Sequence, residues 1–504
     1  MSTGLLEDIF EFVKSLTKSE KRYFKLYSMF QQGNKSYMNL FDIIDHQKTY
    51  NEKKISERFF TKNKVSNFPS VKKYLFDQLV ASLKSYGKYK DLDSTHTDLI
   101  ETYKVLHYKG LYGQSERLLK KIKTVTLRDD AFIRHFYVLI MEYLREMFNT
   151  DNPNKERVQQ VLEEKTHILN IIHNYTFVGD LFSYQRLYLR EKLYCRTKKE
   201  KEELTKLMHP VLQTTESEML SRTALALRNL GLCDYYMAIG ETEKAFETSK
   251  KYLELGKTGT GDRTDTTTIS ENVQHLWLCI RSGIYGDFEE RINDFKKMLD
   301  TIRNQQKYMM GYERWYNYSL IYFIRRGQFE KAVDFMNSEK QIMAKLGDQF
   351  SMKAKIMLGY FTAVFHYAMK DYRASLKMIQ KIINDTNDKM EEFSFAKLLL
   401  MFIHYDLKNY ELLDYQVRSY RRLMQKNERI YKCENAMLAF FTSVNAADTK
   451  TQRQEQLQVL KIQITKILKN PFEKGFTFYF DIHAWLESQL TGKEYAGVVA
   501  AEQN

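Results

Sequence analysis

The chain has 504 residues, of which 43% are apolar and 28% are charged, a balance that excludes disorder over most of its length. Lysine and arginine outnumber acidic residues by 78 to 64, and this excess of +14 is too dilute to imply nucleic-acid or membrane binding. Only four prolines and twenty glycines interrupt a chain too long for one compact core, so the composition predicts a continuous array of long helices.

The first 92 residues are predicted to form an accessory or cap region of short helices joined by polar loops. The helix expected from residue 70 has one apolar face, which must dock on other helices. The N-terminus carries acidic residues among its apolar ones and lacks a basic start and a cleavage site, so no signal peptide is expected. The expected helices are 5–16, 19–30, 37–46, 52–60 and 70–86.

From about residue 93 the expected helices lengthen, and a four-residue turn recurs between amphipathic patterns. Its later copies begin at Gly286, Gly327, Lys370 and Lys408, at intervals of 38 to 43 residues. In each copy we expect the first residue to end one helix, an Asp or Asn to cap the next, and an aromatic residue to pack. Since such helix pairs bury their apolar faces only against neighbouring pairs, the pattern predicts an all-α superhelix.

The segment 232–246, LCDYYMAIGETEKAF, resembles the most recognisable stretch of a tetratricopeptide repeat. Cys233 and Ala245 stand where small residues let two helices approach, and Tyr236 stands at the aromatic position between them. Weaker copies of the pattern extend the resemblance over about residues 93–430. The resemblance implies an α-α superhelix of antiparallel helix pairs, although the intervals are longer than 34 residues and closer to those of HEAT-type repeats.

Three later segments are predicted to differ from the repeat. Residues 256–268 are rich in Gly, Thr and Asp, so we expect a flexible loop between a first half at 93–255 and a second half at 269–490. The phenylalanines after Pro471 match both the alternation of a strand and the i+4 spacing of a helix. A helix is predicted, because a lone strand would lack a partner. Residues 491–504 are expected to be a disordered tail.

The cysteines and the hydropathy pattern indicate a compartment. The four cysteines are far apart and form no Cys-x-x-Cys pair, which argues against a disulfide framework and a structural zinc site. No uninterrupted apolar run reaches the roughly 18 residues that a membrane helix needs. We therefore expect a cytoplasmic protein that does not bind a membrane.

Three patterns resemble functional motifs but are incomplete. Residues 256–258, Gly-Lys-Thr, lack the earlier glycine and the strand of a phosphate-binding loop. Glu164 and His167 have the spacing of a di-iron ligand pair, but no second copy exists. His366 and His404 recur in adjacent repeats, where shared packing is favoured over metal binding or pH sensing. The sequence therefore predicts no enzyme, no cofactor and no metal.

The resemblance also implies a binding surface, because the first helix of each pair in such repeats lines a concave groove. Arginine and tyrosine combine charge-assisted hydrogen bonds with large contact area, a mixture common at binding hot spots. The alternative is that the tyrosines pack between adjacent helices. The groove positions are Arg314, Asn317, Arg325, Tyr360, Tyr367 and Tyr405.

Two basic clusters could reach phosphate groups. Arg418, Arg421 and Arg422 are interleaved with tyrosines, a pattern that suits single-stranded nucleic acid, and residues 18–25 contain four further cations. Acidic residues neighbour both clusters, and no nucleic-acid-binding module is legible. Nucleic acid is therefore the less favoured partner.

The favoured hypothesis is a non-enzymatic scaffold that binds a protein or peptide partner along its concave groove. The alternative is a regulator whose N-terminal helices or basic face contact nucleic acid while the repeats sense a partner. An enzyme with a site hidden between helices has only the histidine and Glu-x-x-His patterns in its favour. The sequence gives no signal for an oligomeric state.

Overall fold

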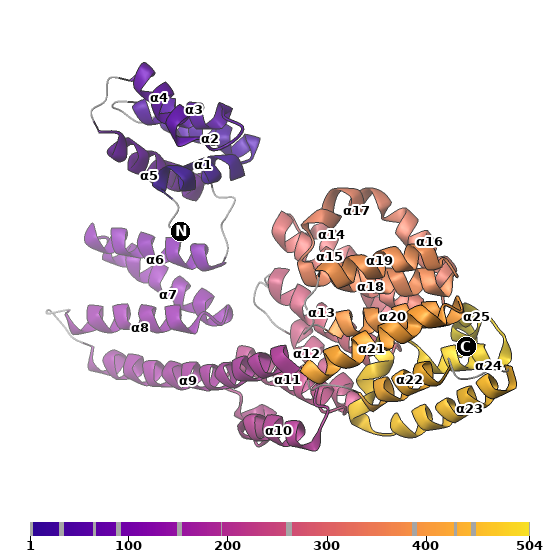
Figure 1. Ribbon diagram of the computed structural model, residues 1–504. Coiled ribbons are helices and arrows are strands. Elements are labelled where there is room, and N and C mark those ends of the chain that lie inside the picture. The colour runs from indigo at the N-terminus through magenta and orange to yellow at the C-terminus, as the bar shows by residue number, and fades with distance from the viewer. Residues whose placement is uncertain are drawn as a thin grey trace. The chain divides into compact units, whose positions relative to one another are not determined.

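The computed structural model describes residues 4–29, 35–63, 67–86, 92–148, 154–192, 194–258, 265–385, 391–427, 431–444 and 450–502. Within these ranges every regular element is a helix and there is no strand, which confirms the all-α fold class (Figure 1). None of the described helices combines the length and apolar content needed to cross a bilayer. The chain divides into two compact units, 1–129 and 130–504.

The first unit contains seven described helices. Helices α1 to α5 share one core, in which the apolar face of α5 packs against α1, α2 and α3 as expected. Helices α6 and α7 form a pair, and the expected boundary after residue 92 falls inside this unit. The helices are α1 (Leu5–Ser15), α2 (Lys18–Met29), α3 (Ser36–His46), α4 (Glu52–Lys62), α5 (Phe68–Tyr86), α6 (Leu92–Tyr108) and α7 (Tyr112–Arg128).

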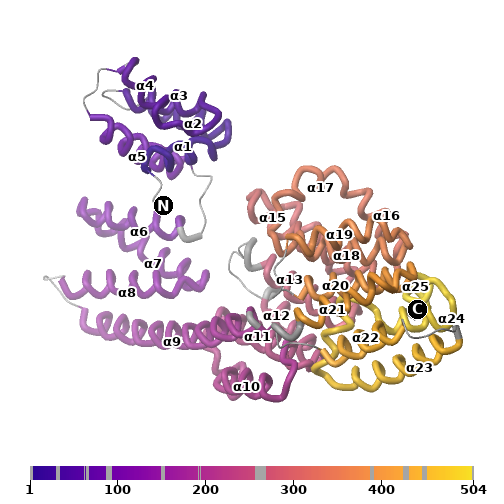
Figure 2. Tube along the Cα trace, viewed as in Figure 1, coloured from indigo at the N-terminus to yellow at the C-terminus, as the bar shows by residue number. Residues whose placement is uncertain are grey.

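The second unit is a series of helix pairs in which neighbours along the chain pack together (Figure 2). Helices α13, α15, α18 and α20 also pack on one another in succession, which is the contact pattern of a superhelix. The first seven helices are α8 (Phe132–Met147), α9 (Lys155–Lys192), α10 (Lys198–Leu212), α11 (Arg222–Ala238), α12 (Thr242–Thr258), α13 (Asp265–Ser282) and α14 (Phe288–Thr301).

The rest of this unit continues the same arrangement and ends in short elements. Its helices are α15 (Gln305–Arg325), α16 (Phe329–Ser338), α17 (Lys340–Leu346), α18 (Met352–Ala368), α19 (Tyr372–Asp385), α20 (Glu391–Asp406), α21 (Tyr410–Asn427), α22 (Lys432–Ser443), α23 (Lys450–Ile467), α24 (Ile482–Thr491) and α25 (Tyr495–Glu502). Short 3₁₀ helices are η1 (Glu216–Glu218), η2 (Gly347–Gln349) and η4 (Pro471–Phe478).

The recurring turn has one backbone geometry at five places. Gly110, Gly240, Gly327, Lys370 and Lys408 all have φ between 59° and 81°, the left-handed region. In each turn this residue's N–H donates to the carbonyl three residues earlier, and the next N–H donates to the carbonyl five residues before it. This pair of bonds is a Schellman cap, so the helix ends predicted at 327, 370 and 408 are confirmed, although Gln328 makes no side-chain cap to α16.

The turn predicted at Gly286 is different, and that prediction is wrong. Helix α13 ends at Ser282, and Gly283, with φ of 76°, takes the left-handed conformation in place of Gly286. The side chain of Asp287 does not cap α14, whereas Asp371 accepts a hydrogen bond from the Ala374 N–H at 3.1 Å. The carboxylate of Asp287 is therefore directed elsewhere.

The segment expected to be a flexible loop is shorter than predicted. Helix α12 continues to Thr258 and α13 begins at Asp265, so both ends of the expected 256–268 loop are helical. Residues 259–264 lie outside the described residues. The two ends of the loop were misassigned because the low helix propensity of Gly and Thr is a weak effect. Packing of the neighbouring helical turns can override it.

The segment from Pro471 onward is helical, as predicted in preference to a strand, but it is divided into two elements. Residues 471–478 form the 3₁₀ helix η4 rather than an α-helix, and α24 begins at Ile482. The expected disordered tail after residue 491 contains α25, in which Val498 and Val499 are buried. We call residues 471–502 the C-terminal segment.

Replacing Lys408 by glycine is expected to stabilise the second unit by about 1 kcal/mol. An L-residue in the left-handed region is strained by contact between its Cβ and the backbone, and glycine removes that contact. The free energy of unfolding from urea titrations measures the change. Gly327→Ala is the control, since its Cβ would lie 2.5 Å from the Ala500 Cα and should destabilise the unit. Destabilisation by Lys408→Gly would contradict the assignment.

Candidate functional site

The inner helices of the second unit are buried on nearly all sides. Helices α18 and α20 carry buried apolar residues around their whole circumference, whereas α19 and α21 bury a single face. A helix that is apolar all round must be covered on both sides. One side packs on the outer helices, and the other is covered by the C-terminal segment.

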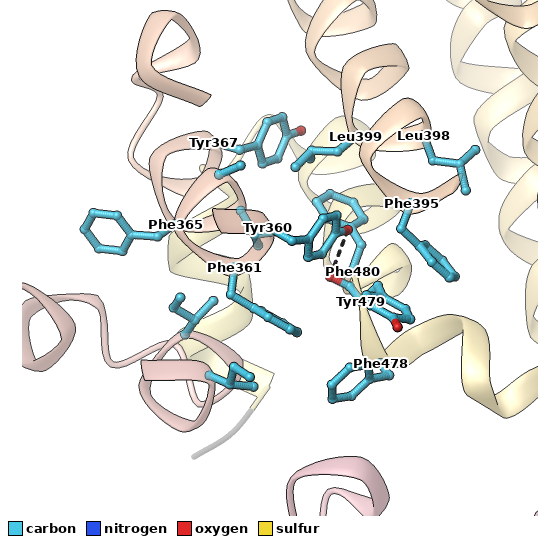
Figure 3. Packing of buried hydrophobic residues seen from close by; sticks show 14 of the residues in the cluster. Tyr360, Phe361, Phe365, Tyr367, Phe395, Leu398, Leu399, Phe478, Tyr479 and Phe480 are labelled. Atoms are coloured by element: carbon cyan, nitrogen blue, oxygen red, sulfur yellow. Dashed lines mark hydrogen bonds between the residues drawn. The ribbon is translucent and has the colours of Figure 1, made fainter. Parts of the chain in front are cut away.

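Aromatic side chains of the C-terminal segment fill the space between α18 and α20 (Figure 3). Tyr479 stacks on Phe395 of α20 with ring centroids 4.1 Å apart, and Phe480 stacks on Phe402 at 4.5 Å. Phe478 meets the edge of Phe361 of α18 at 5.4 Å. These contacts close the concave face over this part of the superhelix.

Polar side chains of the inner helices bind the backbone of the same segment. The guanidinium of Arg325 donates to the carbonyl oxygens of Thr477, at 3.1 Å, and Phe478. The Tyr360 hydroxyl donates to the carbonyl oxygen of Tyr479 at 3.2 Å, as the dashed line in Figure 3 shows. The groove therefore holds a chain segment by donors to its carbonyls and by rings around its side chains.

A buried carboxylate of the same segment, Glu473, fastens it to α22. Glu473 accepts hydrogen bonds from the Lys432 and Cys433 N–H groups at 3.0 and 3.2 Å, and thereby caps the start of α22. Its neighbour Glu434 accepts from the Tyr420 hydroxyl at 2.9 Å and the Tyr431 N–H at 2.8 Å. Burial raises the pKa of Glu434 to about 7, despite nearby charge and these hydrogen bonds.

Glu434→Gln is expected to remove part of the pH dependence of stability. Between about pH 4.5 and 7 the folded state keeps a proton on Glu434 that the unfolded state has lost, so stability falls as pH rises. The loss amounts to about 3 kcal/mol above pH 7. Glutamine is neutral throughout, so the difference between wild type and variant isolates this group. Urea unfolding of the second unit from pH 5 to 8 tests it, and parallel curves would contradict it.

Most of the predicted groove residues are not accessible to a partner in the structure. Asn317, Tyr360, Tyr367 and Tyr405 are buried. Tyr367 packs on Phe480 at 5.5 Å, and Tyr405 on Trp485 at 5.4 Å. The C-terminal segment thus covers the three tyrosines, whereas the Asn317 amide donates to the carbonyl oxygen of Ala354 in α18 at 3.3 Å. The sequence could not show this packing, because the repeat resemblance implies which helices line the concave face but not which segment packs against them.

Arg314 is the predicted groove residue that remains accessible, with its side chain 30% exposed. It lines an open cavity of about 720 Å³ formed by α9, α11, α13, α15 and α18. The open groove, as we call it, adjoins the filled part, because Trp277 lines it and also meets Phe478 edge to face at 5.5 Å.

The open groove is basic and aromatic. Its aromatic walls include Phe182, Tyr194, Trp277 and Tyr318. Its one acidic lining residue, Asp234, is paired with Arg186 at 2.9 Å and accepts from the Gln274 amide at 2.9 Å. This leaves a surplus of positive charge on the rim. The basic lining residues are Arg186, Arg190, Arg314 and Lys353.

The predicted phosphate-binding cluster lies on α21, away from these lining residues. Arg418 pairs with Asp414, and Arg421 donates to the Thr442 hydroxyl at 3.2 Å, while Arg422 is exposed. The cluster is therefore partly committed to internal partners. Its assignment to phosphate stays a prediction.

Other sequence candidates have ordinary surroundings. In the first unit, two cations of α2, Lys21 and Lys25, pair with Asp45 and Asp42 of α3 at 2.7 and 2.8 Å. The Gly-Lys-Thr run at 256–258 lies in the last turn of α12, whereas a phosphate-binding loop precedes a helix. These contacts give neither segment a geometry suited to phosphate.

The incomplete histidine motifs also lie in ordinary surroundings. His366 pairs with Asp371 at 3.4 Å, and burial lowers the pKa of His404 on α20. On α9, Glu164 is 41% exposed and lies 4.0 Å from Arg157. None of these contacts assembles a catalytic group.

Comparison with known proteins identifies no relative, since no protein-family model and no curated protein sequence matches the chain.

Proposed function

We propose that the protein is a non-enzymatic, tetratricopeptide-like helical-repeat scaffold that binds a peptide segment of a protein partner in the open groove. The observation that carries this proposal is the way the adjoining part of the same groove holds residues 477–480. There, an arginine and a tyrosine donate to backbone carbonyls while aromatic rings enclose the side chains. The open groove offers the same side-chain types, and no described segment of the chain occupies it.

We infer the class of partner from the chemistry of the open groove. Arg190 and Lys353 are exposed, and Arg314 is partly exposed and lies 3.6 Å from Glu313. A bound carboxylate would therefore meet positive charge at the surface of this groove. Trp277 and Tyr318 stack at 5.6 Å and form an aromatic wall beside these cations. A peptide that carries acidic and apolar or aromatic residues together matches this surface. Arginine and aromatic residues are also the side chains that dominate binding energies at protein interfaces.

Replacing Arg190 and Arg314 together by alanine should weaken the binding of acidic aromatic peptides by at least about tenfold. Each lost charge-assisted hydrogen bond contributes roughly 1.5–3 kcal/mol. Fluorescence anisotropy with labelled peptides measures the affinities. The peptides contain both acidic and aromatic residues, only one of the two kinds, or neither. The control, Arg418→Ala with Arg422→Ala, removes the same charge from α21 and should leave binding unchanged.

Two outcomes would overturn the proposal. One is that no peptide of the set binds the wild-type chain. The other is that both double variants bind peptide with equal affinity, which would mean that net charge, and not the groove, governs binding. A gel shift with single-stranded oligonucleotide, repeated at several salt concentrations, tests the nucleic-acid alternative, since phosphate contacts weaken steeply with salt.

A further inference from the structure

A histidine, a cysteine and an aspartate meet at the junction of α12, α13 and α14. His275 and Cys279 lie one turn apart on α13, and Asp287 precedes α14. Their ligand atoms all lie within 4.8 Å of one another, and no other such group of three occurs among the described residues. His275 and Cys279 are fully buried, while the Asp287 side chain is 29% exposed.

Hydrogen bonds hold the orientation of His275. The Ser249 hydroxyl donates to the carbonyl oxygen of Phe246 at 2.6 Å, and its oxygen lies 2.9 Å from His275 Nδ1. When Phe246 takes the hydroxyl proton, Nδ1 donates to Ser249, and Nε2 of the neutral ring carries no proton.

Nε2 faces two further electron-rich atoms. Asp287 Oδ1 lies 3.3 Å from Nε2, and Cys279 Sγ lies 3.5 Å from it. When Nε2 carries no proton, Nε2 and Oδ1 are both acceptors, and a cation between them makes this approach favourable. A neighbouring cation, Arg291, donates to the other oxygen, Oδ2, at 2.9 Å and leaves Oδ1 directed at the histidine.

Two of these distances match the edges of a tetrahedral zinc site. With Zn–N of about 2.0–2.1 Å, Zn–S of about 2.3 Å and Zn–O of about 2.0–2.2 Å, the N···S and N···O edges are about 3.6 and about 3.4 Å. The structure has 3.5 and 3.3 Å. The third edge, from Cys279 Sγ to Asp287 Oδ1, lies within 4.8 Å and would shorten to about 3.6 Å around the ion. The contact between Nδ1 and Ser249 resembles the outer contact that metal-binding histidines make through their second ring nitrogen.

The turn before α14 gives independent evidence that Asp287 does not act as a helix cap. At the equivalent place of a later repeat, Asp371 caps the following helix, as an aspartate there normally does. Asp287 leaves α14 uncapped and turns its carboxylate toward His275.

We propose that His275 Nε2, Cys279 Sγ and Asp287 Oδ1 bind one Zn²⁺, with water as the fourth ligand on the exposed side of Asp287. Binding releases the thiol proton of Cys279 to solvent, and the thiolate and carboxylate then balance the charge of the ion. The prediction from sequence of no metal site missed this cluster, because its cysteine has no cysteine partner and Asp287 was assigned to helix capping.

A catalytic cysteine is a poorer explanation of the same residues. In a Cys-His-Asp triad the aspartate binds the histidine nitrogen that faces away from the thiol. Here Ser249 occupies that nitrogen, and Asp287 and Cys279 both approach Nε2.

The test uses the full-length chain, stripped with a chelator and titrated with Co²⁺ and then Zn²⁺. We expect one metal ion per chain, a thiolate-to-Co²⁺ charge-transfer band, and a Zn²⁺-dependent rise in melting temperature. Cys279→Ser should abolish the band and lower Zn²⁺ affinity by about 100-fold or more. Cys233→Ser, at another fully buried cysteine on α11, is the control and should bind like the wild type.

Two further variants keep the test decisive if Cys279→Ser fails to fold. Asp287→Asn changes a partly exposed side chain and should weaken Zn²⁺ while the thiolate band persists with Co²⁺. Ser249→Ala removes the outer contact and should lower affinity by about 10- to 100-fold. The proposal fails if the wild type shows no band and no Zn²⁺-dependent melting shift, or if Cys279→Ser binds Zn²⁺ unchanged. A proton shared by His275 and Asp287 would then explain the cluster.

Discussion

The packing of the C-terminal segment against the inner helices is the constraint on which the second unit depends. Helices α18 and α20 are apolar on the side that a simple superhelix would leave open to water. Each buried aromatic ring removes about 150–250 Å² from solvent, so rings such as Tyr479 and Phe480 make this covering strongly favourable. Arg325, Tyr360 and Glu473 then fix the path of the backbone.

This covering divides the concave face into two chemical surfaces. The filled part is apolar and closed, and the open groove keeps its arginines and lysine accessible at the rim. Arg281 lies at the junction, with its guanidinium 4.3 Å from the Tyr194 ring, which lines the open groove, and 3.9 Å from the Phe478 ring. A peptide bound in the open groove would therefore meet the C-terminal segment at one end of the groove.

Much of the architecture could be predicted from local patterns, and the failures have physical causes. The turns at Gly327, Lys370 and Lys408 were predictable because a left-handed residue between two amphipathic stretches is a local signal. The turn predicted at Gly286 was wrong because Gly283, three residues earlier, takes the left-handed conformation in its place. The filling of the groove depends on contacts across more than a hundred residues, as between Tyr360 and Tyr479. Its one visible sign was that α18 and α20 lack a polar face.

The open groove and the proposed metal cluster are related through α13. Gln274 and Trp277 of this helix line the groove, while His275 and Cys279 face α12 and α14. A metal ion that joined α13 to the start of α14 would limit the movement of the helix that carries the groove wall. The two features thus share a helix although their chemistry is separate.

The order of synthesis gives the C-terminal segment a further consequence. A ribosome produces α13, α15, α18 and α20 long before residues 471–502, so rings such as Phe361 and Phe402 emerge into water without their cover. Chaperones exist to shield such surfaces during translation. Until residues 471–502 have been translated, the inner apolar faces of α18 and α20 have no cover from this segment.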